Sequence, residues 1–301
     1  MRPAQHYTMG GVRTLPTGES PTLTGLFAAG EAACWDMHGF NRLGGNSVAE
    51  TVVAGMIVGE FIADFCDDPG NEFNLPTGVV REFVEREQAK LDALVGSRGT
   101  EDASALKARM QEIMTAKVGI FRTGKDLEEA VAELQQLLQR SRNIGLRAHA
   151  PGANPELVTA YRVQRMLKLA LTVAYGALVR TESRGAHYRE DYPRRNDAEW
   201  LKRTLATWKD GESMPTLGYE PLDVMRMELP PGWRGYGAKD YVDHPDTPRR
   251  QAEVEALKQK YAGDRFALQR ALLPYEDLLP ARLRGRNERL DEPLTGAGRA
   301  A

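Results

Sequence analysis

The apolar residues between positions 79 and 181 recur every three to four residues, which is the spacing of helices that bury one face. The pattern predicts four helices, over residues 79–95, 101–118, 125–142 and from Asn154 to about Thr181. The expected inward faces consist mostly of Leu, Val and Met: Val80, Phe83, Val84, Leu91, Leu94 and Val95, then Leu106, Met110, Ile113 and Met114, then Leu127, Val131, Leu134, Leu137 and Leu138. Asn154 and Pro155 suit the cap and the first turn of the fourth helix. We therefore expect a helical bundle domain over residues 76–182.

Before the bundle, short apolar pieces alternate with Gly, Pro and Thr. Residues 1–30 predict turns and a hairpin, followed by a short buried strand from Leu26 to Ala29. From Ser47 to Phe65 small apolar residues are dense and two glycines allow close backbone approach. This second stretch predicts a buried helix.

Beyond Gly185, Pro, aromatic and charged residues interrupt any regular period, which predicts short strands and loops wrapped around the bundle. One further helix is expected from Thr247 to Leu273, and residues 280–301 are expected to form a peripheral tail.

Composition narrows the classes of protein that the chain can be. Its 301 residues and 42% hydrophobic content are enough for two domains or one large one. A net charge of −2 provides no overall field that would attract nucleic acid, so no nucleic-acid partner is expected. The longest apolar run, Thr51 to Phe65, is interrupted by Glu60 and Asp64, so we expect no membrane-spanning helix. The two cysteines, Cys34 and Cys66, lack metal-site spacing and are expected to be packed thiols in a reducing compartment.

Candidate chemistry is concentrated in the segment HGFNRLGGNS, residues 38–47. Ser47 stands where a helix should begin, so the N–H groups there should be unpaired and should attract negative charge. Gly44 and Gly45 would let a ligand approach, and the planar guanidinium of Arg42 suits a carboxylate. The pattern predicts a site for an acid beside Arg42 and for a polar ring or phosphate at the helix end. The alternative is a structural arginine next to a Gly-Gly turn.

Two further residues are candidates for the same site. His6 precedes a second Gly-Gly turn, and it either points into the site or packs structurally. Glu31 is expected at the end of a short strand, where α/β proteins often place groups that bind ribose or ribityl hydroxyls. An isolated glutamate is otherwise simply a solvated charge.

Four motifs in a fixed order, RPAQHYTMGG, GLFAAGEAAC, HGFNRLGGNS and ESRGAHYREDYPRRND, resemble the flavoprotein subunit of the succinate dehydrogenase and fumarate reductase family. The segments GIFRTGKDLEEAVAELQQL, WLKRTLA and GYGAKDY are most similar to the bacterial quinol:fumarate reductase branch. The resemblance covers essentially the whole chain. It implies an α+β fragment: the end of an FAD-binding, Rossmann-type domain over residues 1–68, the helical bundle over 76–182, and an irregular α+β C-terminal region over 183–301.

The resemblance also implies a chemistry, which is hydride transfer between N5 of FAD and fumarate or succinate. His6 and Arg42 match residues that hold substrate carboxylates against the flavin. Glu31 matches the glutamate that binds the ribityl or ribose region of FAD, and the helix start Asn46–Val48 matches the segment facing the pyrimidine end of the flavin. The implied partners are an iron–sulfur subunit and, indirectly, a membrane anchor subunit. The implied location is peripheral, on the cytoplasmic face of the inner membrane, in the electron transport of anaerobic respiration.

In the family, the Gly-rich dinucleotide fingerprint, the flavin-attachment histidine, the capping domain and the proton-transferring arginine all precede the first of these motifs. No GxGxxG opens a βαβ unit in this sequence. We therefore expect the chain to be the C-terminal half, whether as a truncated gene model, a fragment or one half of a split protein. Its partner would then be the missing N-terminal half. Alone, it is expected to contain no catalytic residue, to bind FAD poorly and to catalyse nothing.

Two alternatives remain open at the level of sequence. L-aspartate oxidase shares the HYxMGG and NRL..NS elements but usually has Ala-Ser where this chain has Gly44 and Gly45. Residues 79–181 could also act only as a helical interaction module without catalysis. For Arg184, His187 and Arg189 a structural charge network is the preferred interpretation, because no chemical role follows from their pattern.

Overall fold

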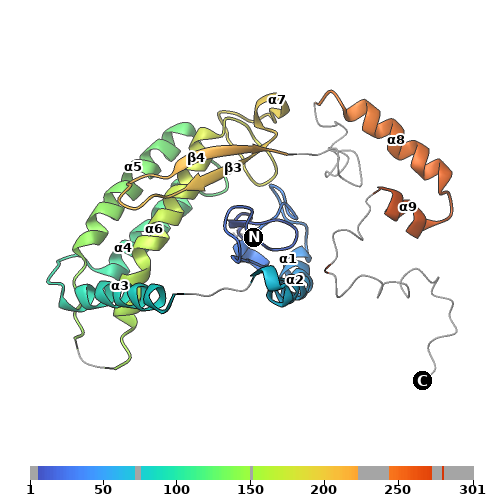
Figure 1. Cartoon of the computed structure of the whole chain (residues 1–301). Coiled ribbons are helices and arrows are strands. Elements are labelled where there is room, and N and C mark those ends of the chain that lie inside the picture. The colour runs from blue at the N-terminus through green and yellow to red at the C-terminus, as the bar shows by residue number, and fades with distance from the viewer. Residues whose placement is uncertain (1–5, 72–75, 150–151, 223–243, 273–279, 281–301) are drawn as a thin grey trace, which may run out of the picture. The chain divides into compact units, whose positions relative to one another are not determined.

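The computed structural model describes residues 6–71, 76–149, 152–222, 244–272 and 280, and Figure 1 labels the helices and strands. The chain separates into two compact units. The first comprises Met1–Glu72 together with Leu222–Ala301, and the second is the helical unit Phe73–Pro221. The division expected from the sequence, into residues 1–68, 76–182 and 183–301, stays a prediction. Within the described residues, no helix combines the length and the apolar character needed to cross a membrane.

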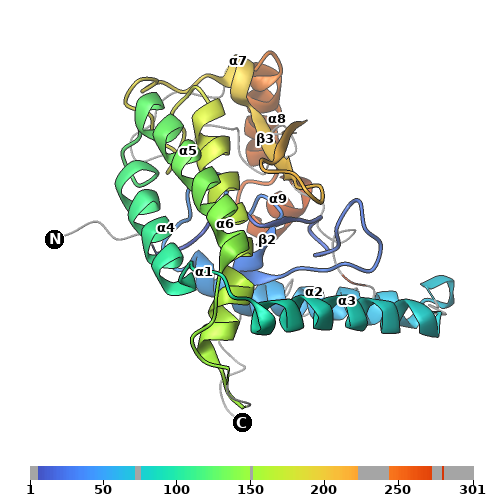
Figure 2. The same ribbon diagram turned by 90° about the vertical axis from the view of Figure 1, so that its left-hand side faces the viewer.

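The helical unit contains the four predicted helices. They are α3 (Thr77–Gly96), α4 (Ala103–Lys117), α5 (Gly124–Arg140) and α6 (Pro155–Val179). The short helix α7 (Asp197–Trp200) and an antiparallel hairpin, β3 (Lys202–Thr207) and β4 (Thr216–Pro221), follow in the chain. Figure 2 shows α4, α5 and α6 lying side by side, and their facing side chains form the core of the unit.

The core of the helical unit is built from the leucines that the periodicity selected. Leu127 and Leu134 have no exposed surface, and neither does Leu167 of α6, for which no inward face was predicted. Helix α5 is closed at its start by Thr123, whose Oγ1 accepts the Asp126 N–H at 3.1 Å. The predicted cap of α6 is also confirmed, because Asn154 Oδ1 accepts the Leu157 N–H at 3.1 Å. In α5 and α6 the capping hydrogen bonds and the buried leucines therefore both support the same helices.

Helix α3 differs from the prediction in its packing. Val80, Phe83 and Val84 are 51–59% exposed, although they were expected to face the core. Of the predicted face, Leu94 near the end of the helix packs against the core. Periodicity identifies an apolar stripe, but it does not say whether another element covers that stripe.

Two backbone segments pass unusually close together at Gly99 and Gly145. Arg98 forms an isolated β-bridge with Gly145, and Glu101 forms one with Ile144. A Cβ on Gly145 would overlap the carbonyl oxygen of Gly99, and a Cβ on Gly99 would overlap that of Asn143. Only glycine fits at both positions, because the crossing has no room for a side chain.

The N-terminal part of the first unit has little sheet. Strands β1 (Val12–Arg13) and β2 (Ala33–Cys34) pair in parallel. The predicted buried strand Leu26–Ala29 is wrong: this stretch makes one isolated bridge, from Phe27 to Glu19, and Leu26 is 41% exposed. The turn hydrogen bonds of residues 18–28 take the place of a strand ladder.

The predicted helix after Ser47 is present, but its expected burial is wrong. It runs through α1 (Asn46–Val48), a wider π-helical stretch (Ala49–Ala54) and α2 (Gly55–Asp67). Apolar side chains along it are 38–71% exposed, namely Val48, Val52, Val53, Met56 and Ile62. The side chains that are buried along this run are Glu50 and Val58. The helix therefore hides a carboxylate and exposes a valine-rich face.

Two helices are described after residue 243, where a single one was predicted. Helix α8 (Thr247–Lys260) and helix α9 (Arg265–Leu272) are separated at Gly263, whose φ of +92° is incompatible with a continuous right-handed helix. Apart from Pro280, the predicted C-terminal tail lies outside the described residues, as do residues 223–243 of the predicted strands and loops.

Candidate functional site

The start of α1 offers an open approach to its backbone. Gly45 is the residue before the helix, with a left-handed φ of +85°. A Cβ added at Gly44 or Gly45 would meet nothing within 4 Å. No atom of the described residues therefore crowds these two glycines, and the predicted approach of a ligand to this backbone stays a prediction.

We expected the backbone N–H groups at the start of α1 to be unpaired. This is wrong for two of the three residues Asn46–Val48. Asn46 N–H donates to the Leu43 carbonyl at 3.1 Å, and Val48 N–H donates to the Gly45 carbonyl at 3.1 Å. The tight turn through Gly45 brings these carbonyls under the first helical turn. Among the hydrogen bonds recorded for the described residues, none uses the Ser47 N–H.

Arg42 and the segment after His6 lie together. The Arg42 guanidinium stacks over the Tyr7 ring, 5.5 Å from its centroid, and the Arg42 N–H reaches Met9 Sδ at 3.1 Å. Arg42 Nη1 also donates to the Leu43 carbonyl at 3.2 Å. His6 is exposed. The two predicted substrate residues thus come from segments that the structure brings side by side.

Glu31 joins the same segments from a different element. It lies in a short 3-10 turn, Gly30–Ala32, just before β2, so its predicted position at the end of a strand is wrong. Its Oε1 accepts the Thr8 N–H at 2.8 Å. This bond holds the backbone two residues after His6, and the predicted contact of Glu31 with a flavin stays a prediction.

Sequence reasoning missed a buried carboxylate beneath these residues. Glu50, 2% exposed, accepts hydrogen bonds from the Tyr7 hydroxyl, from Trp35 Nε1 at 3.0 Å and from His38 Nε2 at 2.6 Å. We call these four residues the Glu50 cluster. The signal in the sequence was a single acidic residue inside the valine-rich run 48–58. Its three donors could not be found in the same way, because they come from distant positions.

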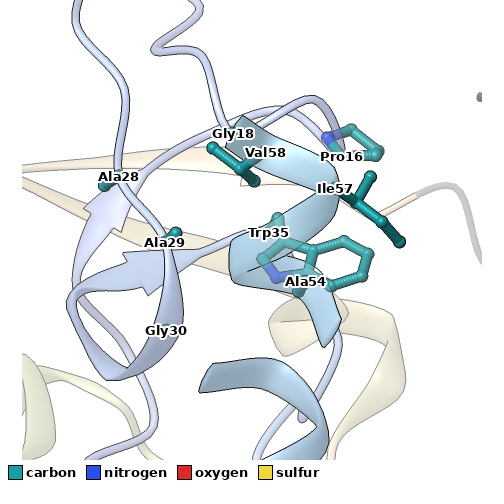
Figure 3. Close-up of a pocket in the computed structure, with 9 residues that line it drawn as sticks. All are labelled: Pro16, Gly18, Ala28, Ala29, Gly30, Trp35, Ala54, Ile57 and Val58. Atoms are coloured by element: carbon teal, nitrogen blue, oxygen red, sulfur yellow. The ribbon is translucent and has the colours of Figure 1, made fainter. Parts of the chain in front are cut away.

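A small apolar pocket adjoins the Glu50 cluster at Trp35. Figure 3 shows the Trp35 ring beside Ala54 and Ile57 of the helix, with Ala29 and Gly30 opposite. Its volume of about 40 Å³ has room for little more than a water molecule. The pocket is too small for a dinucleotide, so the open helix start is the better candidate for a cofactor.

The helical unit holds a second set of buried charges, centred on Glu182. This carboxylate has no exposed surface. It accepts Arg180 Nη1 at 2.6 Å and both Nε and Nη2 of Arg184 at 2.9 Å. Arg184 Nη2 also donates to Asp197 Oδ1 at 2.7 Å. Paired arginines therefore compensate the buried acidic groups here.

Nearby arginines close the ends of two helices. Arg189 Nη1 donates to two carbonyls at the end of α6, at 2.9 and 2.8 Å, and Arg122 Nε donates to the carbonyls of the two residues directly after α4, at 3.2 and 2.9 Å. Arg122 Nη1 also donates to His187 Nδ1 at 2.9 Å. Burial and then the charge of Arg122 lower the pKa of His187 to about 4. These contacts agree with the structural network preferred for Arg184, His187 and Arg189.

Comparisons with known proteins agree with the motifs. Residues 1–48 match the model of an FAD binding domain, and residues 107–236 match the model of the fumarate reductase flavoprotein C-terminal region. The chain is 52% identical over 299 residues to a fumarate reductase flavoprotein subunit of Helicobacter pylori, covering 97% of this chain and 41% of the relative. It is 34% identical over 238 residues to the succinate dehydrogenase flavoprotein subunit of Bacillus subtilis, covering 79% of this chain and 40% of that one.

The solved FrdA chain of Escherichia coli quinol fumarate reductase is also similar, with a TM-score of 0.70 and 32% identity, over 79% of this chain and 40% of that chain. The fold is therefore that of the matching part of this flavoprotein subunit. The chain belongs to the fumarate reductase and succinate dehydrogenase flavoprotein family, as the motifs predicted. It spans about 41% of the length of the first relative it matches.

Proposed function

We propose that this chain forms part of an FAD-dependent enzyme that interconverts fumarate and succinate. In this proposal residues 1–68 complete the Rossmann-type FAD-binding domain. The helix start at Asn46, Ser47 and Val48 lies at the pyrimidine end of the flavin, and Glu31 binds its ribityl or ribose region. His6 and Arg42 hold the carboxylates of the substrate.

The observation that carries the proposal is the placement of Arg42. Its guanidinium is stacked on Tyr7, next in sequence to His6, and it stands beside the open backbone at Gly44 and Gly45. A planar guanidinium held in this way can bind a carboxylate through two hydrogen bonds. A diacid bound there would lie next to whatever occupies the start of α1.

The residues of this chain would contribute binding and electrostatics. Bound FAD supplies the hydride chemistry. The positive end of the α1 dipole would stabilise negative charge that gathers at the adjacent ring during reduction. Arg42 and His6 would fix the orientation of the dicarboxylate. Holding a substrate in the reactive orientation typically lowers the activation free energy by about several kcal/mol.

The same proposal implies which subunits this protein binds. An iron–sulfur subunit and, through it, a membrane anchor subunit would place the protein peripherally on the cytoplasmic face of the inner membrane. The exposed valine-rich face of the helix from Asn46 to Asp67 would pack against the rest of the flavoprotein. The relatives are longer than this chain, so they contain sequence that could provide that cover.

The test uses the purified protein that carries this chain. We expect flavin absorbance near that of one FAD per chain, and fumarate reduction with a reduced viologen dye. Arg42→Ala should lower kcat/KM for fumarate about 100-fold, by the loss of a bidentate carboxylate contact worth about 3 kcal/mol. Arg42→Lys should recover only part of this, because lysine keeps the charge but not the planar fork.

Arg81→Ala is the matched control, because Arg81 is an exposed arginine of α3. It should leave kcat/KM unchanged. A colourless protein would contradict the proposal and favour a helical interaction module. A yellow protein that oxidises L-aspartate and does not reduce fumarate would favour the L-aspartate oxidase alternative.

A further inference from the structure

We infer that Glu50 is a positioning residue, which holds the His6–Tyr7 segment and the loop leading to Arg42 in the arrangement that a dicarboxylate requires. The inference rests on the proposed function, and it assigns a role to a residue that touches neither the proposed substrate nor the flavin.

The Glu50 cluster joins two segments of the chain, one around Tyr7 and one from Trp35 to Arg42, to the helix that carries Glu50. Tyr7 comes from the first segment, Trp35 directly follows β2, and His38 lies in the loop before Arg42. The rings of Tyr7 and His38 also meet edge to face, with centroids 5.1 Å apart. Glu50 is therefore the common acceptor for both of these segments.

The cluster is connected to both proposed substrate residues. Tyr7 is covalently next to His6, and its ring carries the Arg42 guanidinium at 5.5 Å. His38 stands four positions before Arg42 in the same loop. A shift of Tyr7 or His38 would consequently move Arg42 and His6 relative to each other.

The position of Glu50 is too costly to be incidental. A buried carboxylate needs full compensation, and within the described residues the recorded ion pairs give Glu50 no arginine or lysine, only His38. Its remaining compensation comes from the Tyr7 hydroxyl and Trp35 Nε1. Burial, followed by the hydrogen bond to Glu50, raises the pKa of Tyr7, which keeps that hydroxyl protonated as a donor.

Local backbone geometry explains how a carboxylate reaches this position. Glu50 lies in the π-helical stretch Ala49–Ala54, between the α-helical turns before and after it. Such widened turns redirect side chains and occur frequently at functional sites. Here the carboxylate is directed under the loops while Val52 and Val53 remain 53% and 54% exposed.

The experiment compares Glu50→Gln with Glu50→Asp and with Glu60→Gln in the protein that carries this chain. Glu60 is a matched control, because it is a carboxylate of the same helix run for which no hydrogen bond or ion pair is recorded in the described residues. Backbone hydrogen exchange over residues 6–10 and 35–45 is measured first. Succinate affinity by calorimetry, the KM and kcat for fumarate, and FAD content follow.

We expect Glu50→Gln to increase exchange in both segments at least tenfold and to leave exchange in α4, α5 and α6 unchanged. The Kd for succinate and the KM for fumarate should rise by about tenfold, equivalent to about 1.4 kcal/mol, with a smaller change in kcat. FAD content should remain near that of the wild type. Glu50→Asp should recover part of the succinate affinity, and Glu60→Gln should match the wild type.

Two results would overturn the inference. Unchanged exchange in Glu50→Gln would show that Glu50 does not hold these segments. Increased exchange with unchanged Kd and KM would show that it holds them without positioning the substrate. A wild-type protein that binds neither FAD nor succinate would instead overturn the proposed function, and hydrogen exchange would still decide whether Glu50 anchors the two segments.

Discussion

The two units each bury a glutamate, and they compensate its charge in different ways. Glu182 in the helical unit is held by the guanidinium groups of Arg180 and Arg184. Glu50 in the first unit is held by a phenol, an indole and an imidazole. Glu182, Arg180, Arg184 and Asp197 form a network of paired charges, which we call the Glu182 network, whereas the Glu50 cluster gathers loops. The same residue type therefore serves stability in one unit and the placement of a candidate site in the other.

The largest expected effect is on the Glu182 network. Glu182→Gln removes the charge that compensates two arginines, and the guanidinium of Arg180 is nearly fully buried. Breaking a buried pair from one side costs about 3–5 kcal/mol. Urea denaturation followed by circular dichroism should show this loss in the free energy of unfolding. Glu133→Gln alters a more exposed ion pair with Lys117 and should lower the free energy of unfolding much less. Equal losses in the two variants would show that burial does not distinguish the two ion pairs.

A smaller effect is expected from the pH dependence of His187. Its pKa is lowered from 6.5 to about 4 in the folded protein, so the unfolded chain binds the proton more readily between these values. Stability should therefore fall as pH decreases from about 6.5 to 4, by up to roughly 3 kcal/mol. His187→Gln should remove this part of the dependence. An unchanged pH profile of the unfolding free energy in the variant would contradict the assignment.

The smallest effect is expected from a matched pair of tryptophans. Trp35 Nε1 donates to the Glu50 carboxylate at 3.0 Å, and Trp208 Nε1 donates to the Thr172 hydroxyl at 2.9 Å. Trp35→Phe should cost about 1.5–3 kcal/mol and Trp208→Phe about 0.5–1.5 kcal/mol, since bonds to charged groups are stronger. Thermal unfolding of both variants measures the difference. If Trp208→Phe lowers the stability as much as Trp35→Phe does, then the charge of the Glu50 carboxylate does not strengthen its hydrogen bond with Trp35.

The helical unit was largely predictable from the sequence. Periodicity, the cap at Asn154 and the buried leucines all act within a few residues of one another, so a local pattern carries them. The exposure of Val80 and Val84 was not predictable, because the pattern does not reveal what covers a face.

The candidate site was predictable only where a motif spans adjacent positions. The helix start and the proximity of Arg42 to the Gly-Gly turn follow from HGFNRLGGNS. The Glu50 cluster depends on contacts between residues as far apart as Tyr7 and Glu50, which no local pattern encodes. The paired amides of Asn46 and Val48 were missed because they depend on the exact path of the turn at Gly45.

The crossing at Gly99 and Gly145 has a consequence for how substitutions are tolerated. Neither glycine belongs to the candidate site, yet any replacement would push two backbones apart. In a saturation mutagenesis screen both codons should therefore reject every other amino acid. Such strict selection would resemble that of an active-site residue, although its origin is the space between two peptide planes.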